Sequence, residues 1–267
     1  MVGAGAVPRV AGTIEDQPAL QIGARVGYAV SGVLHLLIGW IALQVAWSGS
    51  GKAADQSGAL QTLAGSSLGR LTLWVAVLGF LALGLWQLAN GFAARSASGS
   101  SLWATRAKSL SKGIVYLVLA WTCFNFAKGR PSSSKAQSAD FTATLLQQTG
   151  GRVLVAVVGL VVIGVGGYHV VKGWTKKFLQ DLDGHPGALA TRAGAVGYIA
   201  KGIALVVVGV LFVAAAAQNS ASKATGLDGA LRSLRQQPAG SWLLTAIALG
   251  IAAYGVYSFA RARHARV

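Results

Sequence analysis

Three side chains that could take part in chemistry lie inside long apolar runs: His35, Tyr116 and His169. An imidazole in such surroundings can carry a proton or bind haem iron. His35 lies about 15 Å from the Arg25 end of its run and about 8 Å from His169 in depth, at 1.5 Å per helical residue. Two axial ligands of one iron need similar depths, so this difference disfavours haem binding by the two histidines. We favour the alternative that they form hydrogen bonds between helices.

Two lysines, Lys112 and Lys201, lie close to one end of an apolar run. Each could contact an anionic lipid headgroup or an acidic partner, which contributes about 1 kcal/mol per residue near a charged leaflet. Alternatively, each side chain reaches the membrane surface along its own four-carbon stem and binds nothing. Both interpretations require a membrane.

No motif for catalysis or metal binding accompanies these residues. Asp181, Asp183 and His185 alternate as metal ligands can, but the later glutamate of a calcium loop is missing. A solvated turn before Pro186 is the better interpretation. The single cysteine, Cys123, excludes an internal disulfide and a thiolate metal cluster. We therefore predict a protein that is not an enzyme and that holds no cofactor and no metal.

The composition is too apolar for a water-soluble domain. Of 267 residues, 54% are hydrophobic and 11% are charged, whereas roughly a quarter of residues are charged in soluble domains. The net charge of +16 could suit nucleic acid, but the basic residues lie in short clusters between apolar runs. That spacing is typical of loops held on the cytoplasmic side of a membrane. The sequence therefore predicts lipid, and no nucleic acid, as the partner.

Six apolar stretches are long enough, or nearly so, to cross a bilayer as helices, which need about 20 residues each. They are residues 26–47, 69–93, 108–127, 151–173, 194–217 and 240–260. Helices are favoured over strands because an open sheet edge in lipid leaves backbone amides unpaired. The acidic residues all lie outside these spans, which disfavours proton- or cation-coupled transport through Asp or Glu.

The distribution of basic residues predicts the orientation. Fourteen of the 23 Lys and Arg fall on the side that holds the N-terminus and nine on the other side, so both termini are expected in the cytoplasm. Residues 1–21 contain no apolar core of the kind that a secretory signal needs, and we expect a disordered tail there.

One unit of two helices occurs three times, at residues 22–95, 103–177 and 192–263, which we call copies one, two and three. Glycines align in the first helices (Gly32, Gly113 and Gly202) and in the second helices (Gly84, Gly166 and Gly255). Small residues let membrane helices approach closely, so these glycines are expected at helix contacts. A short amphipathic helix, capped by Ser57, Asp140 or Asp228, is expected between the two helices of each copy.

Each copy crosses the membrane twice, so all three have the same orientation. We therefore expect an all-α membrane protein built from three parallel tandem repeats of a two-helix hairpin. Pseudo-three-fold symmetry about the membrane normal follows from parallel repeats.

The repeat resembles the bacterial membrane family known as DUF1206, a domain of unknown function that usually occurs as three tandem two-helix copies. The resemblance rests on Arg25-Val-Gly-Tyr28 followed by Gly32, on Gly58-Ala-Leu60 and Gly229-Ala-Leu231, and on the Gly-x-aromatic that closes each copy. Copy two departs from it, with Ser109 in place of the tyrosine and no Gly-Ala-Leu. The resemblance implies the repeat organisation and a bacterial plasma membrane, and it supplies no activity.

Three functions are compatible with this pattern. We favour a non-enzymatic scaffold or accessory subunit that interacts with membrane lipids, anionic ones among them, or with other membrane proteins. The alternative is a channel or carrier for a neutral or anionic small solute, because three hairpins can surround a shared axis. A haem or redox protein using His35 and Tyr116 is the third choice.

Overall fold

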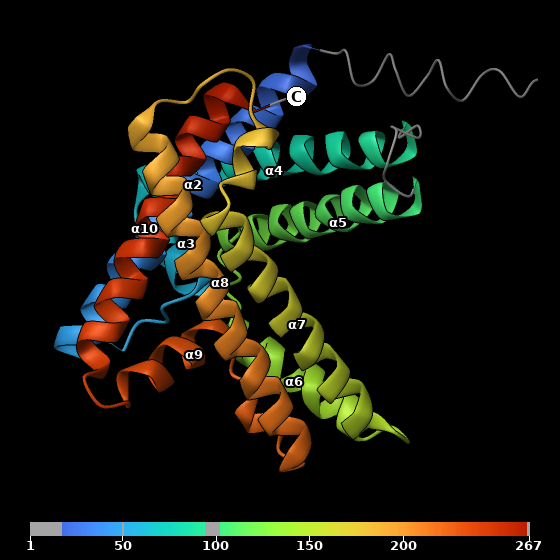
Figure 1. Cartoon of the computed structure of the whole chain (residues 1–267), viewed down its shortest axis with the longest axis vertical. Helices are drawn as coiled ribbons and strands as arrows, with labels where there is room; N and C mark the ends of the chain where they lie inside the picture. Colours follow the sequence, from blue (N-terminus) through green and yellow to red (C-terminus); the bar gives the residue numbers. More distant parts are fainter. Residues whose placement is uncertain (1–17, 50, 94–101, 266–267) are drawn as a thin grey trace, which may run out of the picture.

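The computed structural model describes residues 18–49, 51–93 and 102–265, and six long apolar helices dominate them (Figure 1). They are α2 (Pro18–Ser48), α4 (Ser67–Ala93), α5 (Leu102–Ala127), α7 (Gly151–Trp174), α8 (Ala188–Ala217) and α10 (Gly240–His264). Each contains a segment long and apolar enough to cross a bilayer. The predicted class, an all-α multi-pass membrane protein, is confirmed.

The first helix of each copy begins earlier than predicted. α2, α5 and α8 start at residues 18, 102 and 188, six to eight residues before the predicted spans. Apolarity marks only the part of a helix that lies in lipid, whereas alanine and arginine continue a helix readily in water. The last four residues of the predicted disordered tail are therefore helical, with Pro18 at the first position, where proline is favoured. Residues 1–17 of that tail lie outside the described residues.

A short helix joins the two long helices of each copy, as predicted: α3 (Gln56–Ala64), α6 (Ser134–Leu146) and α9 (Gly226–Arg235). The predicted N-caps are wrong, because Ser57, Asp140 and Asp228 all lie inside the helices. Asp55 caps α3 by accepting from the Gly58 amide, and Ser133 caps α6 by accepting from the Ala136 amide. In copies one and two a polar residue earlier in the loop thus takes the capping role, whereas Thr225, which precedes α9, makes no side-chain capping bond.

The most extensive helix contacts join one copy to the next. α4 packs along α5, α7 along α8, and α10 along α2, and each of these pairs lies side by side in Figure 1. Within copies, α2 packs on α4 and α8 on α10. The described parts of α5 and α7 have no such interface, and in Figure 1 the two helices diverge. Copy two is therefore not a packed hairpin, and the ring of helices is open at this one junction.

The aligned glycines meet one another across the contacts between copies. The three pairs are Gly84 with Gly113, Gly166 with Gly202, and Gly255 with Gly32. A Cβ atom on Gly166 would lie 2.7 Å from the carbonyl oxygen of Gly202, so the two backbones touch at this point. Copy one thus contacts copy two, copy two contacts copy three, and copy three contacts copy one. Rotation of the copies about a membrane normal stays a prediction.

The main apolar core lies among α2, α4, α5 and α10 and includes the fully buried side chains of Leu73, Phe80 and Leu244. Leu60 of α3 and Leu231 of α9 extend it to the side of the bundle away from the termini. In contrast, valine and leucine side chains of α7 are widely exposed, as lipid-facing side chains are. Lys112, Lys172, Lys201 and Arg261 lie toward the other side of the bundle, near Pro18 and Ala265, where the described part of the chain begins and ends.

Candidate functional site

Two repeat positions bring basic residues together at the end of the bundle that carries the termini. One position holds Ser31, Lys112 and Lys201. The other, six residues after the aligned glycines of the second helices, holds Asn90, Lys172 and Arg261. Sequence reasoning singled out only the first position. The spacing from the aligned glycines also marks the second position, but basic residues are common at the ends of membrane helices and there indicate orientation.

Lys201 of α8 lies against His35 of α2 and Tyr254 of α10. Its Nζ is 3.4 Å from His35 Nε2 and 4.4 Å from the centre of the Tyr254 ring. His35 Nδ1 is 2.7 Å from the carbonyl oxygen of Ser31, which can only accept, so Nδ1 carries the proton and Nε2 accepts from Lys201. Both imidazole nitrogens therefore have partners, and neither is free to bind iron.

Lys172 is buried at the end of α7 and forms an ion pair with Asp181, Nζ to Oδ2 2.5 Å. Asp181 closes the 3₁₀ helix η1 (Lys177–Asp181) that follows α7. Burial raises the pKa of the Asp181 carboxyl, but the hydrogen bond and charge of Lys172, with the charges of Arg261 and Lys112, outweigh this and lower the pKa overall. Asp181 is therefore a carboxylate at neutral pH.

Arg261 of α10 has its guanidinium over the Tyr28 ring, 4.2 Å from the ring centre, and near Tyr116 of α5. Its buried Nε has no hydrogen-bond partner within the part of the chain that the structure describes. Lys112 of α5 lies within the electrostatic range of Arg261, Lys172 and Asp181, yet it forms no hydrogen bond or ion pair with the described residues. Aromatic faces attract cations without neutralising their charge.

An aromatic wall supports these cations. Phe178 of η1 stacks on Tyr198 at 5.3 Å and meets Tyr257 edge-on at 5.0 Å, between ring centres. Tyr198 in turn meets Tyr254 edge-on at 5.2 Å. His169 packs on Tyr198, and its Nδ1 lies 2.8 Å from the Val165 carbonyl oxygen. His35 packs on Tyr254, so the two histidines contact different tyrosines. The wall fixes η1 against α8 and α10.

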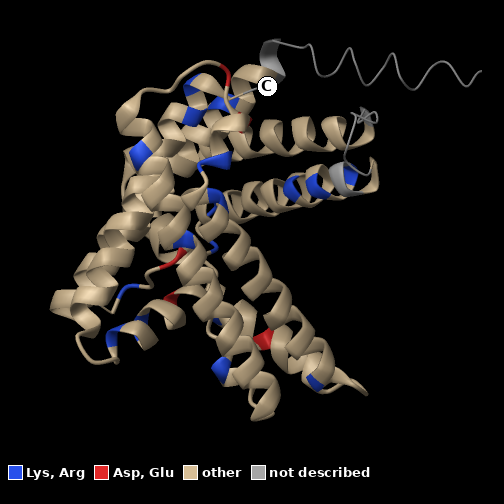
Figure 2. Cartoon of the chain, in the orientation of Figure 1, with Lys and Arg blue, Asp and Glu red and all other residues tan. Residues whose placement is uncertain are grey.

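These residues form what we call the basic cluster: Lys112, Lys172, Lys201 and Arg261. They come from four helices, and the Asp181 carboxylate acts on three of them, Lys112, Lys172 and Arg261. Figure 2 shows how the basic and acidic residues are distributed over the chain. Among the described residues, no three His, Cys, Asp or Glu side chains are grouped so as to hold a metal ion. Four cations beside one carboxylate favour an anion as the ligand of this region.

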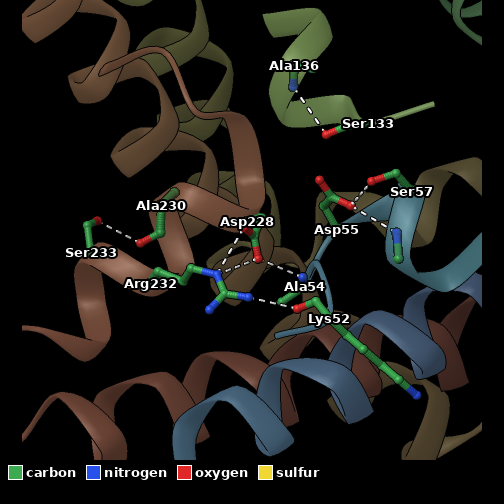
Figure 3. A network of polar contacts seen from close by, with 11 residues as sticks. Lys52, Ala54, Asp55, Ser57, Ser133, Ala136, Asp228, Ala230, Arg232 and Ser233 are labelled. Carbon is green, nitrogen blue, oxygen red and sulfur yellow. Dashed lines mark hydrogen bonds and ion pairs between the residues drawn. The ribbon is translucent and has the colours of Figure 1, made fainter. Parts of the chain in front are cut away.

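A second polar network lies at the opposite end of the bundle and joins copy one to copy three (Figure 3). Asp228 of α9 accepts from the Ala54 amide at 2.8 Å and from Arg232 Nε at 3.0 Å. Arg232 also donates to the carbonyl oxygen of Lys52 at 2.8 Å. The network attaches the loop before α3 to α9. All its members have partners within the protein, so its role is structural.

The family described as Domain of Unknown Function (DUF1206) matches the chain three times, over residues 26–94, 107–176 and 196–265. An uncharacterized protein of Bacillus subtilis (strain 168), YxxB, is 28% identical over 251 residues, which cover 91% of this chain and 90% of that protein. No solved structure matches the chain. The resemblance drawn from the glycine and tyrosine positions is thus confirmed.

Proposed function

Because the chain belongs to the DUF1206 family and is a multi-pass membrane protein, we propose that it is a non-enzymatic scaffold or accessory protein that binds anionic lipid headgroups through its basic cluster. In this proposal the protein lies in the plasma membrane of a bacterium, with both termini in the cytoplasm. The basic cluster then faces the headgroups of the cytoplasmic leaflet, where anionic lipids give a negative surface potential. Other membrane proteins are its further candidate partners.

The observation that carries the proposal is the charge balance of the basic cluster. Lys172 has a carboxylate partner, whereas Lys201 and Arg261 lie against aromatic rings and a neutral imidazole. Positive charges that outnumber the carboxylates around them near a membrane favour an external anion. A lipid phosphate supplies several acceptor oxygens, and it reaches this depth without leaving the bilayer.

The two other functions have less support. A solute pathway along the bundle axis is disfavoured by the apolar core, in which Leu73, Phe80 and Leu244 are fully buried. A haem role is disfavoured because both nitrogens of His35 have partners. The haem role also leaves the excess of positive charge unexplained.

Native mass spectrometry of the purified protein tests the proposal. With equal phosphatidylglycerol and phosphatidylcholine added, the protein should retain phosphatidylglycerol selectively. Lys201→Gln should weaken that selectivity about fivefold, the equivalent of about 1 kcal/mol per basic residue. Lys223→Gln removes an equal charge from an exposed site at the opposite end of the bundle and should leave the selectivity unchanged. Equal retention of both lipids by the unaltered protein would contradict the proposal.

A further inference from the structure

The open junction between α5 and α7 differs in sequence from the closed junctions of copies one and three. Gly27 packs on Gly79 in copy one, where a Cβ atom on Gly27 would lie 2.7 Å from the Gly79 carbonyl oxygen. In copy three, Gly250 packs on Ala200, and Gly197 packs on the backbone of Tyr254. The repeat register places Lys108 where the other copies have Gly27 and Gly197, and Val161 where they have Gly79 and Gly250.

The presence of Lys108 and Val161 in place of glycines explains why α5 and α7 do not pack. Membrane helices approach closely where small residues let their backbones touch. A lysine stem on one helix and a β-branched valine on the other remove that possibility at the crossing point. The helices of copy two are therefore held by their neighbours, α4 and α8, and not by each other.

The same helix faces are buried in the closed copies and open in copy two. Val115 of α5 is 56% exposed, whereas its counterparts Leu34 and Ala204 are 4% and 1% exposed. Val165 of α7 is 43% exposed, against 0% for Leu83 and 6% for Tyr254. A Cβ atom added to Gly164 would meet nothing within 4 Å. We call the surface formed by Lys108, Lys112, Val115, Val161 and Val165 the copy-two seam.

The chemistry of the copy-two seam changes along its length. Its end near the termini carries Lys108, which is exposed, and Lys112, one turn further along the same helix face. Neither lysine has an ion pair in the described part of the chain. Beyond them the surface is apolar, with valines on both helices. Positive charge at one end and exposed apolar side chains beyond it complement a phospholipid whose headgroup is anionic.

We propose that the copy-two seam holds one anionic diacyl phospholipid, with its phosphate on Lys108 and Lys112 and its acyl chains between Val115 of α5 and Val161 and Val165 of α7. Flexible acyl chains can cover these valine side chains, which keep the backbones of α5 and α7 apart. The lipid thus takes the place of the helix contact that glycines provide in copies one and three. This inference rests on the proposed function and adds the location and the number of the bound lipid.

The headgroup part is tested by native mass spectrometry of the full chain with phosphatidylglycerol and phosphatidylcholine. Lys108→Gln with Lys112→Gln should lower retention of phosphatidylglycerol about 25-fold, at about fivefold for each lysine near an anionic group. The matched control, Lys176→Gln with Lys177→Gln, removes the same charge from two exposed positions at the start of η1 and should retain the lipid.

Placing a bulky side chain on the apolar part of the copy-two seam tests where the acyl chains bind. Val115→Trp should displace the bound lipid. Ile114→Trp should not, because Ile114 and its copy-three counterpart Ile203 are both exposed and lie outside the copy-two seam. Thermal unfolding of both variants in detergent verifies that they fold.

The outcomes separate the two proposals. If the unaltered protein retains phosphatidylglycerol selectively and the double lysine variant and Val115→Trp retain it equally well, the lipid site at the copy-two seam is overturned. The proposed function then still stands. Absence of selectivity in the unaltered protein would overturn both. Stoichiometric recovery of a protein subunit in place of the lipid, lost in the Val115→Trp variant, would also overturn the lipid assignment.

Discussion

Small residues let helices pack closely both between copies and within copies. They do so at all three contacts between copies but at only two of the three contacts within copies. All three contacts between copies have a pair of facing glycines, among them Gly166 with Gly202. Within copies, close packing of small residues joins the helices of copies one and three, whereas copy two has Lys108 and Val161 at the crossing point. All three contacts between copies are therefore formed, whereas the missing contact within copy two leaves the ring of helices open between α5 and α7.

The largest effect is expected from breaking a contact between copies. Gly166→Val should cost about 3 kcal/mol, because the new side chain meets the Gly202 carbonyl and Val206 in a packed interface. Thermal unfolding in detergent measures this loss. Gly167→Val is the matched control, since a Cβ atom there would meet nothing within 4 Å. Equal destabilisation by both variants would show that helix propensity, and not the interface, is responsible.

A smaller effect is expected at the network that joins copies one and three. Asp228→Ala removes the acceptor of the Ala54 amide and of Arg232 Nε and should cost about 2 kcal/mol. Its copy-two counterpart Asp140 is exposed, so Asp140→Ala should change stability by less than about 0.5 kcal/mol. Chemical denaturation of both variants compares the two copies at one repeat position. Similar losses of stability in both variants would contradict the difference between copies two and three at this position.

The smallest effect concerns Asp181 and depends on pH. Because its folded-state pKa lies below the ordinary value of 3.8, the carboxylate stabilises the folded protein above about pH 4, and this stabilisation is lost as the pH falls through the folded pKa. Asp181→Asn should therefore cost about 1 kcal/mol at pH 6. The cost should shrink below pH 4. Thermal unfolding at several pH values measures it, and a cost that does not vary with pH would contradict the role of the ion pair with Lys172.

Local patterns made much of the fold predictable. Apolar runs located the six spans, and the glycine register located the copies. What the sequence could not show is which helices pair, because a hairpin such as copy two has the same spacing whether or not its helices touch. The outcome depends on Lys108 and Val161, whose effect becomes visible only beside Gly27 and Gly79.

The candidate site was predicted in part, for a related reason. Lys112, Lys201 and His35 stood out because polar residues are rare inside apolar runs. Lys172 and Arg261 lie at helix ends, where basic residues are common, so their repeat position was overlooked. Their approach to Tyr198 and Tyr28 comes from helices of different copies, which no local pattern describes.

Disulfide cross-linking tests the open copy-two seam most directly. In a Cys123→Ala background, Ala200→Cys with Gly250→Cys should cross-link in copy three, since a Cβ atom on Gly250 meets the Ala200 side chain and a slight separation of the helices permits the bond. The copy-two counterparts, Ser111→Cys with Val161→Cys, should stay reduced in lipid vesicles under the same oxidant. Rapid and complete cross-linking of the copy-two pair would contradict the open seam and the asymmetry built on it.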